Sequence, residues 1–148
     1  MKLFLDTADV ATVSQFWSTG LIDGLTTNPT LMMKAGQLPD KVYHDLKNLG
    51  IKDISMEVVA DTSEGMLSEA RRLISLFGDV VTIKVPCTPE GLLACRELAN
   101  QNIRVNVTLI FSAAQAILAA KAGATYVSPF VGRVDDNSFD GILSLIHI

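Results

Sequence analysis

The chain is poor in cysteine, has no long apolar run and carries little net charge, and each of these absences excludes a class of protein. Two cysteines, Cys87 and Cys95, are too few for a disulfide scaffold or a four-ligand zinc site. No apolar run approaches the roughly 20 residues that a membrane-spanning helix needs. A net charge of −4 gives no sign of nucleic acid as the main partner. Because charged residues occur within the first six positions, we expect no secretory signal and a cytoplasmic protein.

What the chain does contain is enough apolar sequence for one globular core. Hydrophobic residues make up 49% of its 148 positions, which argues against intrinsic disorder. No linker or low-complexity tract interrupts residues 1–142, so we expect a single domain there. Short runs rich in Val, Ile and Leu recur along it and predict strands that are buried on both faces. These runs are Lys2–Asp6, Ile22–Thr26, Ile54–Val59, Val80–Val85, Val105–Leu109 and Thr125–Pro129.

Amphipathic segments separate the predicted strands. The first is expected to be capped by Thr7, and the second connection contains two helical runs. Repeated strand–helix–strand units imply parallel pairing with right-handed crossovers. The predicted helices are Asp9–Trp17, Pro29–Lys34, Pro39–Leu49, Ser63–Phe77, a helix beginning at Pro89, and Ser112–Ala122.

Such a repeat fits either an open doubly wound sheet or a (β/α)8 barrel. A nucleotide-binding open sheet typically carries a Gly-rich turn, yet neither G-x-G-x-x-G nor G-x-x-x-x-G-K-[ST] occurs. Polar residues instead follow strand after strand, and a barrel gathers such positions at one mouth. We therefore predict an α/β fold of the (β/α)8 TIM-barrel type with about six βα units. The polar positions are Asp6, Asn28, Glu57, Lys84, Asn106, Thr108, Ser128 and Arg133.

Lys84 is the most chemically suggestive of these residues. Burial at the end of an apolar strand penalises an ammonium, and the neutral amine is a nucleophile toward carbonyls. The alternative is a lysine that extends from the strand end to solvent. Asp6 and Glu57 are either helix caps or turn residues, or carboxylates that move protons at the mouth of the barrel. Asn28 could cap the helix after it, and this role is compatible with substrate binding.

Three further residues suit a phosphorylated polyol. Asn106 and Thr108 have the same parity on one strand, so both are expected to point inward, where polar groups need partners. A substrate hydroxyl or a catalytic water would supply these. Arg133 has a geometry suited to phosphate, and its alternative is a surface salt bridge with Asp135 or Asp136.

Five motifs in this order resemble one known family. They are Leu5-Asp6-Thr7-Ala8-Asp9, Gly24-Leu25-Thr26-Thr27-Asn28-Pro29-Thr30, Ile83-Lys84-Val85-Pro86, Asn106-Val107-Thr108-Leu109-Ile110-Phe111-Ser112 and Ser128-Pro129-Phe130-Val131-Gly132-Arg133. Together they resemble the compact form of the transaldolase family, which also contains the fructose-6-phosphate aldolases.

The resemblance implies a class I aldol mechanism without a metal or organic cofactor. By similarity, Lys84 forms a Schiff base with a ketose phosphate and Asp6 is the acid/base for C3–C4 cleavage. Glu57 and Thr108 would hold the catalytic water. The implied substrate-binding residues are Asn28 and Asn106 for the dihydroxyacetone moiety, Ser128 and Phe130 in the pocket, and Arg133 for phosphate.

The same resemblance implies a reaction and partners. The chain would interconvert sedoheptulose 7-phosphate plus glyceraldehyde 3-phosphate with erythrose 4-phosphate plus fructose 6-phosphate, in the pentose phosphate pathway. Sugar phosphates would be its ligands, and its relatives form homo-oligomers, pentameric rings stacked into decamers. No nucleic acid or membrane partner is expected.

Two positions separate transferase from lyase in this family. At the positions of Glu57 and Phe130, the aldolases of this family have glutamine and tyrosine. This chain is therefore less similar to the aldolases at both positions. A tyrosine hydroxyl positions the water that protonates the enamine, whereas Phe130 has no hydroxyl. We therefore expect transfer, with the fructose-6-phosphate aldolase activity as the alternative.

The residues at 143–148 form a separate tail in our prediction. Leu143–Ile148 resembles an in-frame translation of a transposon-end sequencing adapter, and relatives continue with two more βα units and a terminal helix. The expectation is a chain shortened after about Ile142. A barrel fragment that binds sugar phosphates without catalysis is the remaining alternative.

Overall fold

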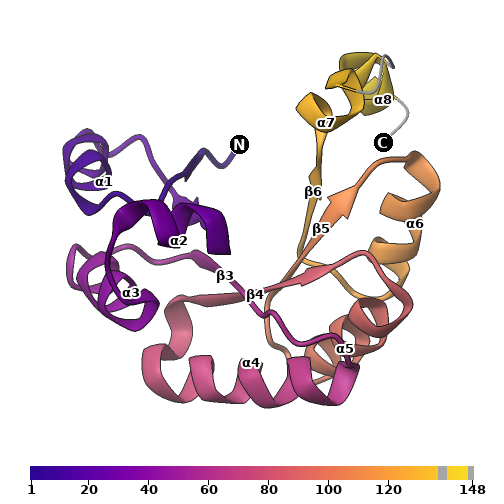
Figure 1. Ribbon diagram of the computed structural model, residues 1–148, viewed down its shortest axis with the longest axis horizontal. Helices are drawn as coiled ribbons and strands as arrows, with labels where there is room; N and C mark the ends of the chain where they lie inside the picture. Colours follow the sequence, from indigo (N-terminus) through magenta and orange to yellow (C-terminus); the bar gives the residue numbers. More distant parts are fainter. Residues whose placement is uncertain (137–139, 147–148) are drawn as a thin grey trace. The chain divides into compact units, whose positions relative to one another are not determined.

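A computed structural model describes residues 1–136 and 140–146, and these residues form two compact units (Figure 1). The first unit contains Met1–Glu57 and Ala70–Thr82, and the second contains Val58–Glu69 and the chain from Ile83 onward. Of the predicted tail at 143–148, the last two positions lie outside the described residues.

The first unit is built on three short parallel strands with helices between them. Asp6 is paired with Thr26 on the next strand, and Thr26 with Ser55 on the third. The elements are β1 (Phe4–Asp6), α1 (Val10–Trp17), β2 (Gly24–Thr26), α2 (Pro29–Ala35), α3 (Pro39–Asn48) and β3 (Ile54–Glu57). The end of α4 (Ser63–Phe77), the 3-10 turn η1 (Gly78–Val80) and the first two residues of β4 (Val81–Pro86) also belong to this unit.

The core of the first unit lies between its strands and α3. Leu25 and Ile54 are fully buried on β2 and β3, and Leu46 is fully buried on α3. Phe77, at the end of α4, contacts the Tyr43 ring edge to face with centroids 5.5 Å apart. Position 24 accommodates only glycine, because a Cβ at Gly24 would lie 2.6 Å from the Asp53 carbonyl oxygen. The strands therefore approach each other closely at this point.

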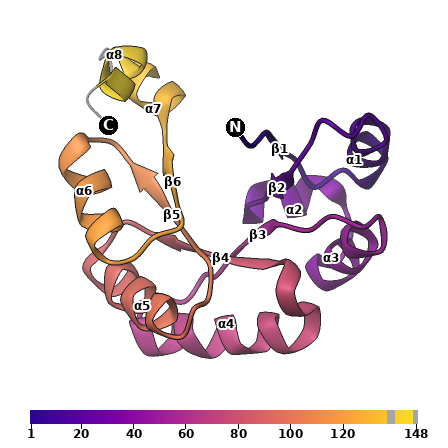
Figure 2. The same cartoon turned by 180° about the vertical axis from the view of Figure 1, so that it is seen from behind.

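The second unit repeats the same arrangement. The strands are parallel and adjacent, with Lys84 paired with Asn106 and Asn106 with Tyr126. Val58, which follows β3, donates its N–H to the Lys84 carbonyl oxygen at 3.1 Å. The remaining elements are α5 (Pro89–Asn100), β5 (Val105–Ile110), α6 (Ala113–Lys121), β6 (Tyr126–Pro129), α7 (Val131–Asp136) and α8 (Gly141–Ile146), and Figure 2 shows them from behind.

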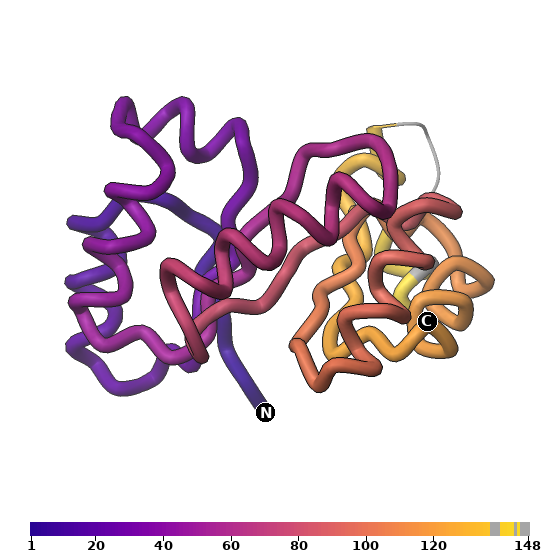
Figure 3. Tube along the Cα trace, turned by 90° about the horizontal axis from the view of Figure 1, so that it is seen from below, coloured from indigo at the N-terminus to yellow at the C-terminus, as the bar shows by residue number. Residues whose placement is uncertain are grey.

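Helices α5 and α6, the second of them rich in alanine, pack on the strands of the second unit. Helices α5 and α6 lie side by side and both contact β5, as Figures 1 and 3 show. Ala94 and Ala119 are fully buried between them and the strands. Gly123 ends α6 with φ of 98°, and a Cβ there would lie 2.7 Å from the Ala99 side chain. Small residues thus allow the two helices to pack closely.

The structure confirms the predicted α/β class with six βα units in the described residues, and corrects details of it. Two strands of the first unit begin two residues later than predicted, at Phe4 and Gly24, whereas β3 begins at Ile54 as predicted. Thr7 is not the cap of α1. Asp9 is the cap, because its carboxylate accepts from the Thr12 N–H at 3.0 Å. No helix among the described residues is long and apolar enough to cross a membrane.

Candidate functional site

Lys84 lies in the middle of β4 and is only 5% exposed. Its neighbours in the strand, Ile83 and Val85, are fully buried. The burial contradicts the alternative of a lysine that extends to solvent. A buried amine next to a polar strand position is an arrangement suited to nucleophilic attack on a carbonyl.

Asn106 and Ser128 form the polar surface next to Lys84 in the second unit. Asn106 is paired with Lys84 across β4 and β5 and is 2% exposed. The Ser128 hydroxyl, on β6, donates to the Asn106 Oδ1 at 2.8 Å. This bond fixes the orientation of the Asn106 amide, so adjacent strands contribute one connected polar face.

Thr108 lies two residues beyond Asn106 on β5 and is 1% exposed. Its backbone oxygen accepts from the Cys87 N–H at 2.8 Å, but its Oγ1 has no hydrogen-bond partner in the described part of the chain. Leaving a buried hydroxyl without a partner costs roughly 1–3 kcal/mol. A ligand hydroxyl or a water would satisfy this group, and the sequence prediction of an inward-pointing Asn106 and Thr108 agrees with their burial.

The predicted residues of the first unit lie at the carboxyl ends of its strands. Asp6 ends β1, and its Oδ1 accepts from the Thr26 hydroxyl at 2.8 Å. Glu57 ends β3 and is half-buried. Asn28 caps α2 by accepting from the Leu31 N–H at 2.9 Å, as the capping interpretation predicts. The cap occupies the amide oxygen and orients the side chain.

Sequence reasoning missed two residues that support this cluster. Thr26 orients the Asp6 carboxylate. The signal in the sequence was that Asp6 and Thr26 end two consecutive predicted strands. Tyr43, on α3, forms a 3.1 Å hydrogen bond with the Thr27 hydroxyl, which itself donates to the Ser55 carbonyl at 2.9 Å. Burial raises the pKa of Tyr43 to about 12, opposed by the hydrogen bond to Thr27. Tyr43 therefore ties α3 to the strand ends that carry Asn28 and Glu57.

Phe130 and Arg133 follow β6. The Phe130 ring packs edge to face on Phe111 with centroids 5.7 Å apart. Arg133 lies exposed in α7. Asp135, one of its predicted alternative partners, accepts from the Gly141 N–H at 2.8 Å. That bond connects α7 to α8.

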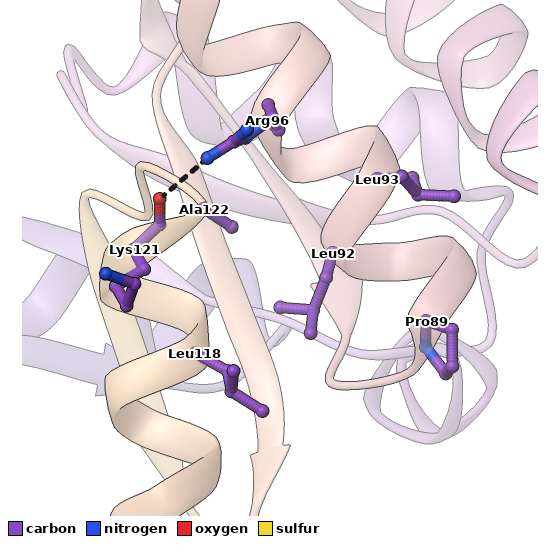
Figure 4. A pocket seen from close by; sticks show the side chains of 7 residues that line it. All are labelled: Pro89, Leu92, Leu93, Arg96, Leu118, Lys121 and Ala122. Atoms are coloured by element: carbon purple, nitrogen blue, oxygen red, sulfur yellow. Dashed lines mark hydrogen bonds between the residues drawn. The ribbon is translucent and has the colours of Figure 1, made fainter.

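A hollow in the second unit lies away from these residues. It has a volume of about 460 Å³ and lies between α5 and α6, where Leu92 faces Leu118 (Figure 4). At the edge of the hollow, the Arg96 guanidinium donates a hydrogen bond to the Lys121 carbonyl oxygen at 3.5 Å. None of the predicted site residues lines it.

The comparisons with known proteins identify the family. The family described as Transaldolase/Fructose-6-phosphate aldolase matches residues 3–144. A probable transaldolase of Geobacter metallireducens is 51% identical over 142 residues, which cover 96% of this chain and 66% of that protein. One of Nitrosopumilus maritimus is 49% identical over 96% of the chain and 64% of its own length. The chain belongs to the transaldolase/fructose-6-phosphate aldolase family.

The match covers nearly all of this chain but not all of its relatives. The chain spans about two thirds of the length of the relatives it matches. A probable transaldolase of Methanococcus vannielii is 50% identical over all 148 residues of this chain, which cover 68% of that protein. Among solved structures, the carboxyl transferase domain of Rhizobium etli pyruvate carboxylase superposes with a TM-score of 0.54 at 12% identity, over 86% of this chain and 26% of that one. This likeness concerns the fold alone.

Proposed function

We propose that the chain carries the catalytic residues of a transaldolase, with Lys84 as the Schiff-base nucleophile. The observation that carries the proposal is a lysine buried on β4, whose register partner on β5 is the buried Asn106, in a chain of this family. Sugar phosphates are the proposed ligands. The proposal requires no metal ion, and no cluster of His, Cys, Asp or Glu within residues 1–136 and 140–146 is arranged to hold one.

The proposed reaction begins at the carbonyl of a ketose phosphate such as fructose 6-phosphate. The Lys84 amine attacks C2, and loss of water gives an iminium ion. Asp6 accepts the proton of the C4 hydroxyl as the C3–C4 bond breaks, and the aldose phosphate departs. The resulting enamine attacks the aldehyde carbon of a second aldose phosphate, whose oxygen takes the proton back. Water then releases the new ketose from Lys84.

The other residues have supporting roles in this proposal. Asn106 and Asn28 bind the hydroxyls of the three-carbon unit, and Ser128 holds the Asn106 amide in place. The Thr108 hydroxyl, which lacks a partner among the described residues, binds the water that carries protons together with Glu57. Arg133 binds the phosphate, for which its exposed, forked guanidinium is suited.

The test measures transfer from fructose 6-phosphate to erythrose 4-phosphate by the appearance of glyceraldehyde 3-phosphate and sedoheptulose 7-phosphate. It uses the 148-residue chain and an extended chain, in which residues 1–142 are followed by the remaining third of the Geobacter metallireducens relative. Lys84→Arg keeps the charge and should abolish turnover. Lys41→Arg, at an exposed lysine paired with Asp45, is the matched control and should leave it unchanged. Turnover that survives Lys84→Arg would refute the proposal.

A second candidate is the lyase activity of fructose-6-phosphate aldolases, because the matching family includes both activities. Phe130 favours the transferase, since its ring packs on Phe111 and has no hydroxyl to position a water. The enamine on Lys84 then persists until an acceptor aldehyde arrives.

A further inference from the structure

Strand β5 contains one extra residue relative to β6. Val107 is paired with Val127 but Ile110 with Pro129, so three steps along β5 correspond to two along β6. The extra residue is Leu109, whose φ of 60° lies in the left-handed region. Only one other non-glycine residue in the described part of the chain, Asn102, has a positive φ. Glycine is the residue that adopts this conformation most readily.

This bulge determines which side chains share a face. In a regular strand Thr108 and Ile110 would point the same way. Because Leu109 is inserted, Ile110 joins the face of Val107, while Thr108 keeps the face of Asn106. All four of these residues are at most 2% exposed, whereas Leu109 is 38% exposed. The strand thus ends with a polar group on one face and an apolar group on the other.

The hydroxyl of Thr108 gains no orientation from a hydrogen bond within the described residues. Its direction therefore depends on the χ1 rotamer of this β-branched residue and on the backbone that carries it. Hydrogen bonds hold that backbone on both sides of the bulge: the Cys87 N–H donates to the Thr108 carbonyl at 2.8 Å, and the Phe130 N–H donates to the Ile110 carbonyl at 2.9 Å. These bonds keep Leu109 in a conformation that a residue with a Cβ rarely adopts.

We propose that Leu109 is a positioning residue that fixes the direction of the Thr108 hydroxyl through its left-handed backbone. A side chain with a Cβ has a narrow left-handed well, so the bulge has one geometry. Glycine would relieve the strain but would allow several geometries at the same place. The expected effect on catalysis rests on the proposed function. The expected effect on the backbone around Leu109 rests on the bulge alone.

The experiment compares Leu109→Gly with Leu109→Ala, in the 148-residue chain and in the extended chain. The alanine variant loses the side chain but keeps the Cβ, so it is the matched control. We expect Leu109→Gly to unfold at the same or a higher temperature, yet to exchange its amide hydrogens at 107–111 faster than the parent chain. Its kcat should fall about tenfold with KM unchanged, because a catalytic group loses its fixed geometry. Leu109→Ala should keep the parent's exchange rates and kcat.

Two results would overturn the inference. Parent-like exchange and kcat in Leu109→Gly would show that the strained conformation does not fix Thr108. Equal losses of kcat in both variants would assign the effect to the leucine side chain. If the parent neither transfers nor forms an adduct on Lys84, the proposed function fails, and the exchange comparison alone decides whether Leu109 fixes the bulge.

Discussion

At the scale of single residues, parity along the strands was enough to find the polar face of the second unit. Asn106 and Thr108 alternate with the apolar Val105 and Val107, and all four are buried. What the sequence could not show is how each polar group is satisfied. Asn106 accepts from Ser128, whereas the Thr108 hydroxyl has no partner in the described chain. That difference requires coordinates, because it depends on the distance between strands.

Thr108→Val tests the role of the unpartnered hydroxyl. Valine has nearly the same shape and removes a buried polar group, so we expect unfolding free energy to stay level or rise by about 1 kcal/mol. Transfer activity should fall, since the proposed water site is lost. Urea unfolding and kcat measured on the same preparation check this. A clear loss of stability would show that the hydroxyl is satisfied in the protein.

Phe130→Tyr tests the choice between transferase and lyase. The added hydroxyl would position a water to protonate the enamine, so free dihydroxyacetone should increase at the expense of transfer. The measurement is the ratio of dihydroxyacetone to new ketose with erythrose 4-phosphate as acceptor. An equal ratio in both proteins would remove Phe130 from the account.

At the scale of elements, apolar runs and caps predicted most of the fold. Ser63–Phe77 is confirmed as α4 with its bounds, because a regular apolar stripe and Gly78 define it. The first helix begins with an Asp9 cap rather than Thr7, since both residues are good caps and the sequence does not distinguish them. The bulge at Leu109 was not predicted, because a leucine gives no sign of a left-handed backbone.

Tyr43→Phe tests the tie between α3 and the ends of β2 and β3. Losing the hydrogen bond to Thr27 should destabilise the protein by about 1 kcal/mol at pH 8. In the parent, the pKa of Tyr43 is about 12, above the ordinary value of 10. The folded state thus favours the neutral phenol. The resulting contribution to the free energy of unfolding is complete below pH 10 and is lost as the pH rises toward 12.

The difference in unfolding free energy between the parent and Tyr43→Phe should therefore shrink between pH 9 and pH 11. Urea unfolding at both pH values measures it. A difference that stays constant across this range would show that the phenol is not held neutral by burial.

At the scale of the whole molecule, the chain has six βα units in its described residues and two thirds of the length of its relatives. Strands β1 and β6 each pair with one neighbour only in the described part of the chain. Unpaired strand edges promote association with other chains. Apolar side chains such as Ile117 and Leu118 are also more than half exposed.

We therefore expect the 148-residue chain to aggregate or to bind an apolar dye, with little transaldolase activity. We expect the extended chain to be soluble and active, because the added third of the relative would cover the open edges. Thermal unfolding and coupled activity of the two chains, measured side by side, check this. A cooperative transition with full activity in the 148-residue chain would contradict the prediction.

The central claim is that Lys84 forms a covalent Schiff base with a ketose phosphate. Its most direct test is reduction of the extended chain with borohydride in the presence of fructose 6-phosphate, followed by mass mapping of the peptides. The account predicts one stable adduct on the peptide containing Lys84 and none in Lys84→Arg, while Lys41→Arg is labelled like the parent. An adduct on another lysine, or no adduct in an active preparation, would contradict it.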